Sequence, residues 1–295
     1  MSIIERAIEK LEQGERRKTE NEVAPRRDES SSEAPPAAAQ RKPAESGREP
    51  HAIAPRRAAQ LNLRRLSTAG FVTPEGTRSA TAEQFRIIKR QLLARAAATP
   101  GGNVILVTSA LANEGKTYVS TNLALSLAME MNRTVLLVDG DTPKPDVCSV
   151  LGVNAHRGLM DFLSGRECSL GDLLIRTDLP KLTLLPAGRP HPHAPELLAS
   201  DAMGDFLKAL GQRYPERVVI FDSAPLLADS GASILAEWAG QVTLVVEAVR
   251  TPQSAVMDAL GILSRTDHVA FVLNKSREPR SANYAYGYYG YHAGR

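Results

Sequence analysis

Short runs of consecutive hydrophobic residues alternate with amphipathic segments over most of the chain. Six runs have the length and continuity of strands buried on both faces, at 103–109, 133–139, 182–188, 217–222, 241–249 and 269–275. The segments between them carry helical periodicity, most clearly at 115–130, 194–214 and 251–266. This alternation predicts an α/β fold with a doubly wound, mostly parallel sheet, in which ligands bind beyond the carboxyl ends of the strands.

Capping residues indicate where two of the helices begin. Ser79 precedes a segment with Phe85, Ile88 and Leu92 on one face, so we expect it to cap a helix at 79–98. Thr251 is expected to cap the helix at 251–266, with Pro252 as its first residue. The segment at 169–176 is predicted as a further short helix.

The two ends of the chain depart from this pattern. Residues 1–17 place apolar side chains on one helical face and predict an amphipathic helix, either frayed or docked on a partner. Residues 18–60 are rich in Pro, Ala, Ser, Glu and Arg, which predicts a disordered linker. The folded domain is therefore expected at 61–278 and a flexible tail at 279–295.

The bulk composition excludes several classes of protein. A hydrophobic content of 43% and a charged content of 23% are ordinary for a globular protein, and a net charge of +3 is too small to indicate nucleic-acid binding. Cys148 and Cys168 show no metal or disulfide spacing, which favours a reducing compartment. No apolar run approaches the ~20 residues of a membrane span. We expect a cytoplasmic protein that a partner holds at the membrane.

A phosphate-binding loop is predicted where the first strand ends. The stretch 110–117, ALANEGKT, has the form A-x-x-x-x-G-K-T and opens a helix. Backbone N–H groups of such a loop bind phosphate. Lys116 is expected to bridge the β- and γ-phosphates of ATP, and the Thr117 hydroxyl to bind Mg²⁺. The residues predicted to contact the nucleotide in this loop are Ala110, Asn113, Glu114, Gly115, Lys116, Thr117 and Tyr118.

Acidic residues follow two other strands at the same expected edge of the sheet. Asp139 and Asp141 end one strand, and Asp222 ends another after four apolar residues. Carboxylates so placed are suited to Mg²⁺, so the predicted metal ligands are these three and Thr117. Asn274, at the end of the last strand, is expected either to meet the adenine ring or to serve as a turn residue.

Most of the tyrosine in the chain lies at its end. Five of seven tyrosines fall there, namely Tyr284, Tyr286, Tyr288, Tyr289 and Tyr291. A tyrosine hydroxyl has a pKa of about 10 and needs a base to become a nucleophile. We expect Asp139 or Asp141 to be that base, beside Lys116. A pliable tail brings several tyrosines in turn to one site, so phosphoryl transfer from ATP to these tyrosines is predicted.

Together these motifs resemble the bacterial tyrosine kinases that control exopolysaccharide synthesis, phosphate-loop proteins of the MinD/ParA-like group. The family's Walker A, Walker A′, Walker B and tyrosine cluster are matched here by ALANEGKT, LLVDGD, VVIFD and YAYGYYGY. The segments at 1–13 and 63–93 resemble the branch of autokinases from loci linked to exosortase (PEP-CTERM) sorting. The resemblance implies an autokinase that uses ATP and Mg²⁺ and phosphorylates its tail in trans.

The resemblance also implies partners. Kinases of this family form homo-oligomers, including rings, and are activated by a transmembrane chain-length-determinant protein, which in this branch is a separate chain. A tyrosine phosphatase would reverse the reaction. The chain is then expected at the inner face of the plasma membrane. Since each phosphate adds about −1.5 to −2 charges, a heavily phosphorylated tail is expected to break a ring.

Several positions depart from the family's pattern. Ala112 and Asn113 stand where Pro-Gly often precedes the EGK of the loop, and 142–144 reads Thr-Pro-Lys where Leu-Arg-Arg is common. The family's oligomerisation helix carries E-x-x-R-x-x-R, and lysine does not reproduce a bidentate arginine contact. The matching residues in the helix at 79–98 are Glu83, Arg86 and Lys89.

Two other functions fit parts of the sequence. A MinD/ParA-like spatial-regulation ATPase shares the fold, but its signature lysine falls at Leu111 here, and it leaves the tyrosines unexplained. A non-catalytic ATP-binding scaffold of polysaccharide export also fits. Asp229 is interpreted as either a functional acid or a helix cap. His191 and His193 are interpreted as an exposed pair rather than a metal site.

Overall fold

The computed structural model describes residues 58–76, 79–166, 169–213, 216–263 and 268–276. The predicted helix at 1–17, most of the predicted linker and the tyrosine tail lie outside these ranges. Among the described residues, no helix is both long enough and apolar enough to cross a membrane.

The strands of the described residues form one sheet in the order β3-β4-β2-β5-β1-β6-β7. Neighbouring strands are parallel except for β3 and β4. This confirms the predicted doubly wound α/β fold. The strands are β1 Val104–Ser109, β2 Thr134–Asp139, β3 Ile175–Arg176, β4 Leu182–Leu185, β5 Arg217–Asp222, β6 Gln241–Glu247 and β7 Val269–Asn274.

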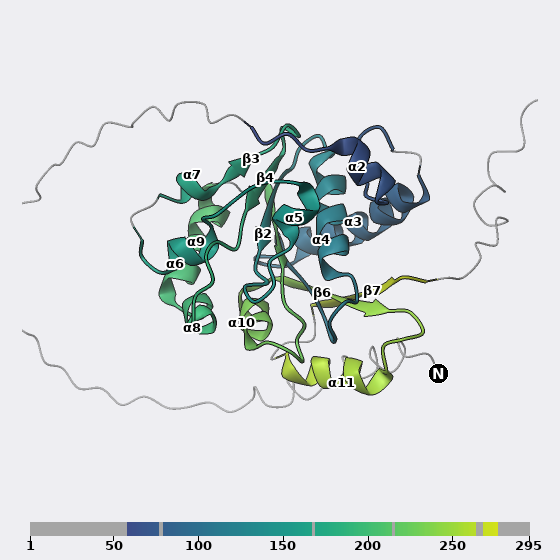
Figure 1. Cartoon of the computed structure of the whole chain (residues 1–295). Helices are drawn as coiled ribbons and strands as arrows, with labels where there is room; N and C mark the ends of the chain where they lie inside the picture. The colour runs from purple at the N-terminus through teal and green to yellow at the C-terminus, as the bar shows by residue number, and fades with distance from the viewer. Residues whose placement is uncertain (1–57, 77–78, 167–168, 214–215, 264–267, 277–295) are drawn as a thin grey trace, which may run out of the picture. The chain divides into compact units, whose positions relative to one another are not determined.

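Helices cover both faces of the sheet (Figure 1). α2 to α5 lie on one side, and α6, α8, α9 and α10 lie on the other. The helices are α2 Leu63–Thr68, α3 Ala80–Ala98, α4 Lys116–Ala128, α5 Val147–Leu151, α6 Leu159–Leu163, α7 Leu170–Leu173, α8 Ala194–Leu198, α9 Asp201–Arg213, α10 Ser230–Trp238 and α11 Gln253–Ile262.

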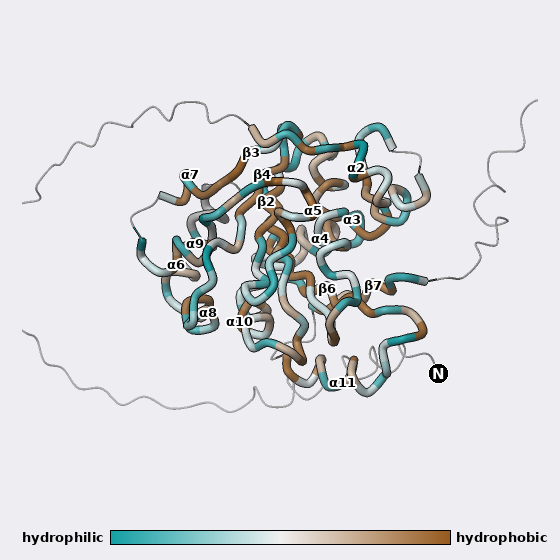
Figure 2. Tube along the Cα trace, viewed as in Figure 1, coloured by the Kyte–Doolittle hydropathy of each residue, from teal (hydrophilic) through white to brown (hydrophobic). Residues whose placement is uncertain are grey.

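The hydrophobic core follows from these two layers. Phe85 and Leu92 of α3 and Leu123 of α4 pack in one cluster with strand residues such as Ile105 and Val135. Alternate residues of the same strands are buried against the opposite layer, which is why the runs are hydrophobic without a gap. Figure 2 shows the central strands coloured mostly as hydrophobic and the outer turns as hydrophilic.

The register of the sheet sets the position of the predicted acids. Asp139 at the end of β2 pairs with Asp222 at the end of β5. β5 in turn pairs with β1, whose last residue, Ser109, leads into the predicted phosphate loop. The loop and both acids are therefore brought to one edge of the sheet by strand pairing alone.

Local predictions hold at one helix start and fail at two other places. Ser79 caps α3, accepting a hydrogen bond from the Ala82 N–H at 3.1 Å. α11 begins one residue later than predicted, with Pro252 as its N-cap, because the Thr251 hydroxyl donates to the carboxylate of Glu114 instead. Within 169–176, α7 ends at Leu173 and the two residues of β3 pair with β4, too short a strand for periodicity to indicate.

Gly158 provides a test of the packing around the loop that follows β4. An added Cβ would lie 1.9 Å from the Pro186 carbonyl oxygen and 2.6 Å from the Gly188 nitrogen. Because both are backbone atoms, Gly158→Ala should lower the free energy of unfolding by about 2–3 kcal/mol. Gly261→Ala in α11 is the control, since nothing lies within 4 Å of its added Cβ. Urea unfolding should separate the two variants, and equal midpoints would contradict the expectation.

Candidate nucleotide-binding site

The loop between β1 and α4 has the backbone shape of a phosphate cradle. Asn113 and Gly115 have φ of 65° and 98°, and Gly115 is the N-cap of α4. A Cβ at Gly115 would lie 2.1 Å from the side-chain nitrogen of Asn274. The dihedral angle therefore favours glycine here, and an added Cβ would also displace the Asn274 amide. The N-terminus of the 13-residue α4 adds N–H groups suited to phosphate.

A cavity of about 480 Å³ lies beside this loop. Its volume is in the range of small-molecule sites, ~300–1,000 Å³. Six of the residues predicted to bind nucleotide or metal line it, namely Asn113, Gly115, Lys116, Thr117, Tyr118 and Asp141.

Three buried carboxylates gather at the edge of the sheet next to the cavity. Asp139 accepts a hydrogen bond from the Val147 N–H, and Asp141 accepts one from the Lys144 N–H, each at 3.1 Å. Asp222 is fully buried, and neither of its carboxylate oxygens has a hydrogen-bond partner within the described part of the chain.

Burial governs the electrostatics of these acids. It raises the pKa of Asp139 to about 8, with a further rise from the charge of Asp222. It also raises the pKa of Asp222 to about 7, against the effect of the Thr117 hydroxyl and the Lys116 ammonium. The pKa of Asp141 is raised by burial as well, and Lys116 is the main opposing influence. The charge of Lys116 thus lowers the pKa of two of the three carboxylates, Asp222 and Asp141.

The donor groups fit Mg²⁺ held jointly by protein and nucleotide. In the described ranges, no three His, Cys, Asp or Glu side chains are grouped so as to hold a metal ion by themselves. Mg²⁺ is usually bound through one or two carboxylates, a hydroxyl, water and substrate phosphate. The unpartnered oxygens of Asp222, near the Thr117 hydroxyl, suit that kind of site.

Two residues of the loop that were predicted to contact nucleotide are buried instead of lining the cavity. Ala110 is inaccessible to solvent, and Glu114 is 2% exposed. The Glu114 carboxylate turns inward and accepts a hydrogen bond from the Leu111 N–H at 2.7 Å. Any contact of these residues with a nucleotide would therefore be made by their backbone.

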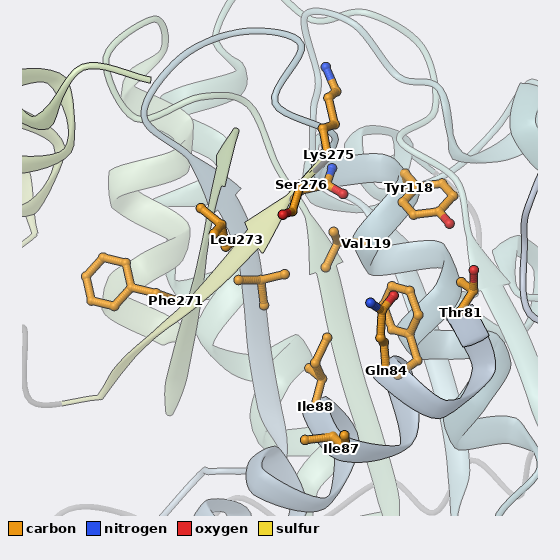
Figure 3. A pocket seen from close by; sticks show the side chains of 13 residues that line it. Thr81, Gln84, Ile87, Ile88, Tyr118, Val119, Phe271, Leu273, Lys275 and Ser276 are labelled. Carbon is orange, nitrogen blue, oxygen red and sulfur yellow. The ribbon is translucent and has the colours of Figure 1, made fainter. Parts of the chain in front are cut away.

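Tyr118 also lines a second cavity, of about 400 Å³, between α3 and β7, and Asn274 lines this second cavity alone. Figure 3 shows Tyr118 and Lys275 toward one end of this cavity, and Ile87 and Ile88 toward the other. The Tyr118 hydroxyl donates to the Gly70 carbonyl at 2.9 Å. The Asn274 amide donates to the Glu114 carbonyl at 2.8 Å, and its contact with adenine stays a prediction.

The predicted oligomerisation residues lie on α3. Glu83 and Arg86 form an ion pair on the exposed side of the helix. Lys89 is buried, and its ammonium binds the Ser126 carbonyl at 3.1 Å and the Glu130 carboxylate at 2.5 Å. Lys89 is thus engaged within its own chain, and the role of the three residues in an oligomer stays a prediction.

Several residues that line the first cavity were not among those predicted to bind nucleotide or metal. Lys144 lines the cavity and lowers the pKa of Asp141. Its place in the sequence, three residues after Asp141, could have indicated that it belongs to the site. Phe71 comes from the loop after α2 and packs on the ring of Tyr118, with centroids 5.1 Å apart. Asp229 caps α10 through the Gly231 N–H at 2.7 Å, which confirms the cap and still leaves it beside the cavity.

Comparison with known proteins agrees with this arrangement. No family model matches the chain. The chain is 30% identical over 190 residues to the tyrosine-protein kinase CpsD of Streptococcus agalactiae, a match that covers 63% of this chain and 81% of CpsD. The chain belongs to the bacterial tyrosine-protein kinase family. It is also 31% identical over 194 residues to the tyrosine-protein kinase Wzc of Salmonella typhimurium, a match that covers 64% of this chain but only 26% of Wzc. The chain therefore matches about a quarter of the length of that relative.

Solved kinase domains share the fold of this family member. The kinase domain of VpsO is 32% identical with a TM-score of 0.53, and the match covers 64% of this chain and 97% of that one. The tyrosine kinase domain of BceF is 26% identical with a TM-score of 0.58, and the match covers 72% and 90%.

The raised pKa of Asp222 makes the stability of the nucleotide-free protein depend on pH. The folded state binds this proton more tightly than the unfolded chain, whose pKa is near 3.8. The stability that Asp222 contributes through this proton is therefore fully present below about pH 4 and is lost as the pH rises through 7. Asp222→Asn should raise the melting temperature by on the order of 5 °C at pH 8 and much less at pH 4.5.

The control for this experiment is Asp258→Asn on α11, because Asp258 is exposed. It should change the melting temperature little at either pH. Differential scanning calorimetry without nucleotide or Mg²⁺ measures both variants. An Asp222→Asn effect of the same size at both pH values would show that the buried charge is not its cause.

Proposed function

We propose that this chain is an ATP-dependent protein-tyrosine autokinase that phosphorylates its own C-terminal tyrosines in trans, within a homo-oligomer, and so regulates exopolysaccharide chain length and export. The observation that carries the proposal is the cavity beside the phosphate loop, where Lys116 faces a set of buried carboxylates. Membership in the tyrosine-protein kinase family supports it, as does the cluster of tyrosines at 284–291.

The cavity is suited to hold the triphosphate of ATP. Lys116 and the N–H groups at the start of α4 supply positive charge and donors to the phosphates. Thr117 and Asp222, with Asp139 and Asp141 nearby, would hold Mg²⁺. The metal would neutralise charge on the phosphates and orient them for attack.

The geometry favours Asp141 over Asp139 as the base. Asp141 lines the cavity, whereas Asp139 does not. In the proposed step, the tyrosine O–H gives its proton to the Asp141 carboxylate while its oxygen bonds to the γ-phosphorus. The bond from the γ-phosphorus to the bridging oxygen breaks, and ADP leaves. Lys144, at the position of the second arginine of the family's pattern, would stabilise the transferred group.

The proposed partners follow from the resemblance and from the exposed side of α3. Glu83 and Arg86 are accessible there for contact with a second copy of the chain. A separate transmembrane chain-length-determinant protein would activate the kinase at the inner face of the membrane, and a tyrosine phosphatase would reset the tail.

Mass spectrometry of the C-terminal tryptic peptide, 281–295, tests the activity directly. After incubation with ATP and Mg²⁺, with and without the cytoplasmic segment of the activator, the wild-type peptide should carry several phosphates. Lys116→Met should abolish them, because it removes the cation that binds the phosphates. Lys208→Met, on the exposed face of α9, is the matched control and should leave the phosphates in place.

Mixing two chains tests transfer in trans. A Lys116→Met chain should gain phosphate only when it is incubated with wild-type protein. An unmodified wild-type tail under every condition, with ATP still hydrolysed, would refute the kinase proposal and favour a spatial-regulation ATPase. An unmodified tail with ATP bound but not hydrolysed would favour a scaffold.

A further inference from the structure

We infer that Glu114 is a positioning residue that holds the phosphate loop in its nucleotide-binding shape, with Thr251 as its partner. The inference rests on the proposed binding of nucleotide at this loop, but it does not require transfer to tyrosine. Glu114 lies within the loop, yet its side chain is 2% exposed and points away from the cavity that the loop lines.

The Glu114 carboxylate joins the two ends of the loop to a distant turn. One oxygen accepts a hydrogen bond from the Leu111 N–H at 2.7 Å, which closes the loop on itself. The other oxygen accepts from the Glu247 N–H at 3.3 Å and from the Thr251 hydroxyl. The turn between β6 and α11 is therefore bound to a loop more than 130 residues earlier in the chain.

The end of β7 binds the same loop through two backbone carbonyls. The Asn274 amide donates to the Glu114 carbonyl at 2.8 Å, and the Lys275 ammonium donates to the Asn113 carbonyl at 2.6 Å. Lys275 also pairs with the Glu247 carboxylate at 2.9 Å. The loop is thus fixed from two sides, by Glu114 from within and by Asn274 and Lys275 from outside.

This arrangement directs N–H groups toward the phosphate position. In a trans peptide unit the C=O and the N–H point in opposite directions. Because the carbonyls of Asn113 and Glu114 point to Lys275 and Asn274, the N–H groups of Glu114 and Gly115 point the other way. That direction leaves them available for phosphate, and it depends on the bonds that hold the carbonyls outward.

Backbone conformation supports the same assignment. Among the described residues, the non-glycine residues with positive φ are Asn113, Val249 and Lys275, at 65°, 69° and 56°. All three belong to the loop, the turn after β6 or the end of β7. Such conformations cost energy and persist where the surroundings enforce them, which is common at ligand sites. The hydrogen bonds of Glu114 and Lys275 connect these three places.

Isothermal titration of the full chain with Mg·ADP tests the inference without reference to kinase activity. Glu114→Gln keeps the size of the side chain, but its amide nitrogen cannot accept a hydrogen bond, so either the Leu111 N–H or the Glu247 N–H loses its acceptor. We expect the dissociation constant to rise by about tenfold or more, as for other residues that orient a binding group. Glu237→Gln, on the exposed side of α10, is the matched control and should bind as wild type.

The Thr251 pair keeps the test decisive if Glu114→Gln fails to fold. Thr251→Val should weaken Mg·ADP binding about threefold or more, because it removes the hydroxyl that reaches Glu114. Thr251→Ser keeps that hydroxyl and should bind Mg·ADP as the wild type does. Melting temperatures without nucleotide are measured for both Thr251 variants as well. If Thr251 had a purely structural role, both variants would lose melting temperature and affinity together.

The outcomes separate this inference from the proposed function. Wild-type affinity in folded Glu114→Gln, or equal affinity in the two Thr251 variants, overturns the positioning role. Weakened binding in Glu114→Gln and Thr251→Val with rescue by serine supports it, even if the tail is never phosphorylated. A wild-type chain that does not bind Mg·ADP overturns the nucleotide site itself, and the positioning role with it.

Discussion

Burial of three carboxylates at one edge of the sheet is the constraint on which the rest of this structure depends. Strand pairing fixes Asp139 beside Asp222, and Asp141 follows two residues later. Burial disfavours the charged form of each acid, and the charge of Asp222 adds to this effect at Asp139, so these acids tend to keep their protons. Lys116 is the nearby cation that moderates this cost at two of them. A bound metal ion would neutralise the remaining negative charge of the carboxylates.

The helices packed on both faces of the sheet hold this edge in place. Helices on both faces bury the central strands almost completely, and the register leaves the acids no freedom to separate. The loop beside them is held with equal firmness, since its carbonyls and its buried carboxylate are bound by β6, β7 and the turn before α11. A site held this way needs little rearrangement to receive a highly charged ligand.

The sequence predicted the parts of this structure that depend on local pattern. Continuous apolar runs identified the parallel strands, and the residues that follow them identified Lys116, Asp141 and the cavity they line. Contacts between distant segments could not be predicted in this way. Glu114 has the position of an exposed loop residue, and its burial depends on Thr251, 137 residues later. Lys89 has the spacing of a surface motif, but Glu130 and Ser126 of another segment draw it inward.

The order of the strands has a consequence for how the protein is made. β5 lies between β1 and β2, although it is synthesised long after both, and β7 is needed to hold the loop from outside. A nascent chain on the ribosome therefore exposes the loop and its first acids well before any phosphate pocket can form. Nucleotide would act late, on an almost complete domain, and would slow the unfolding of finished molecules more than it would speed their folding.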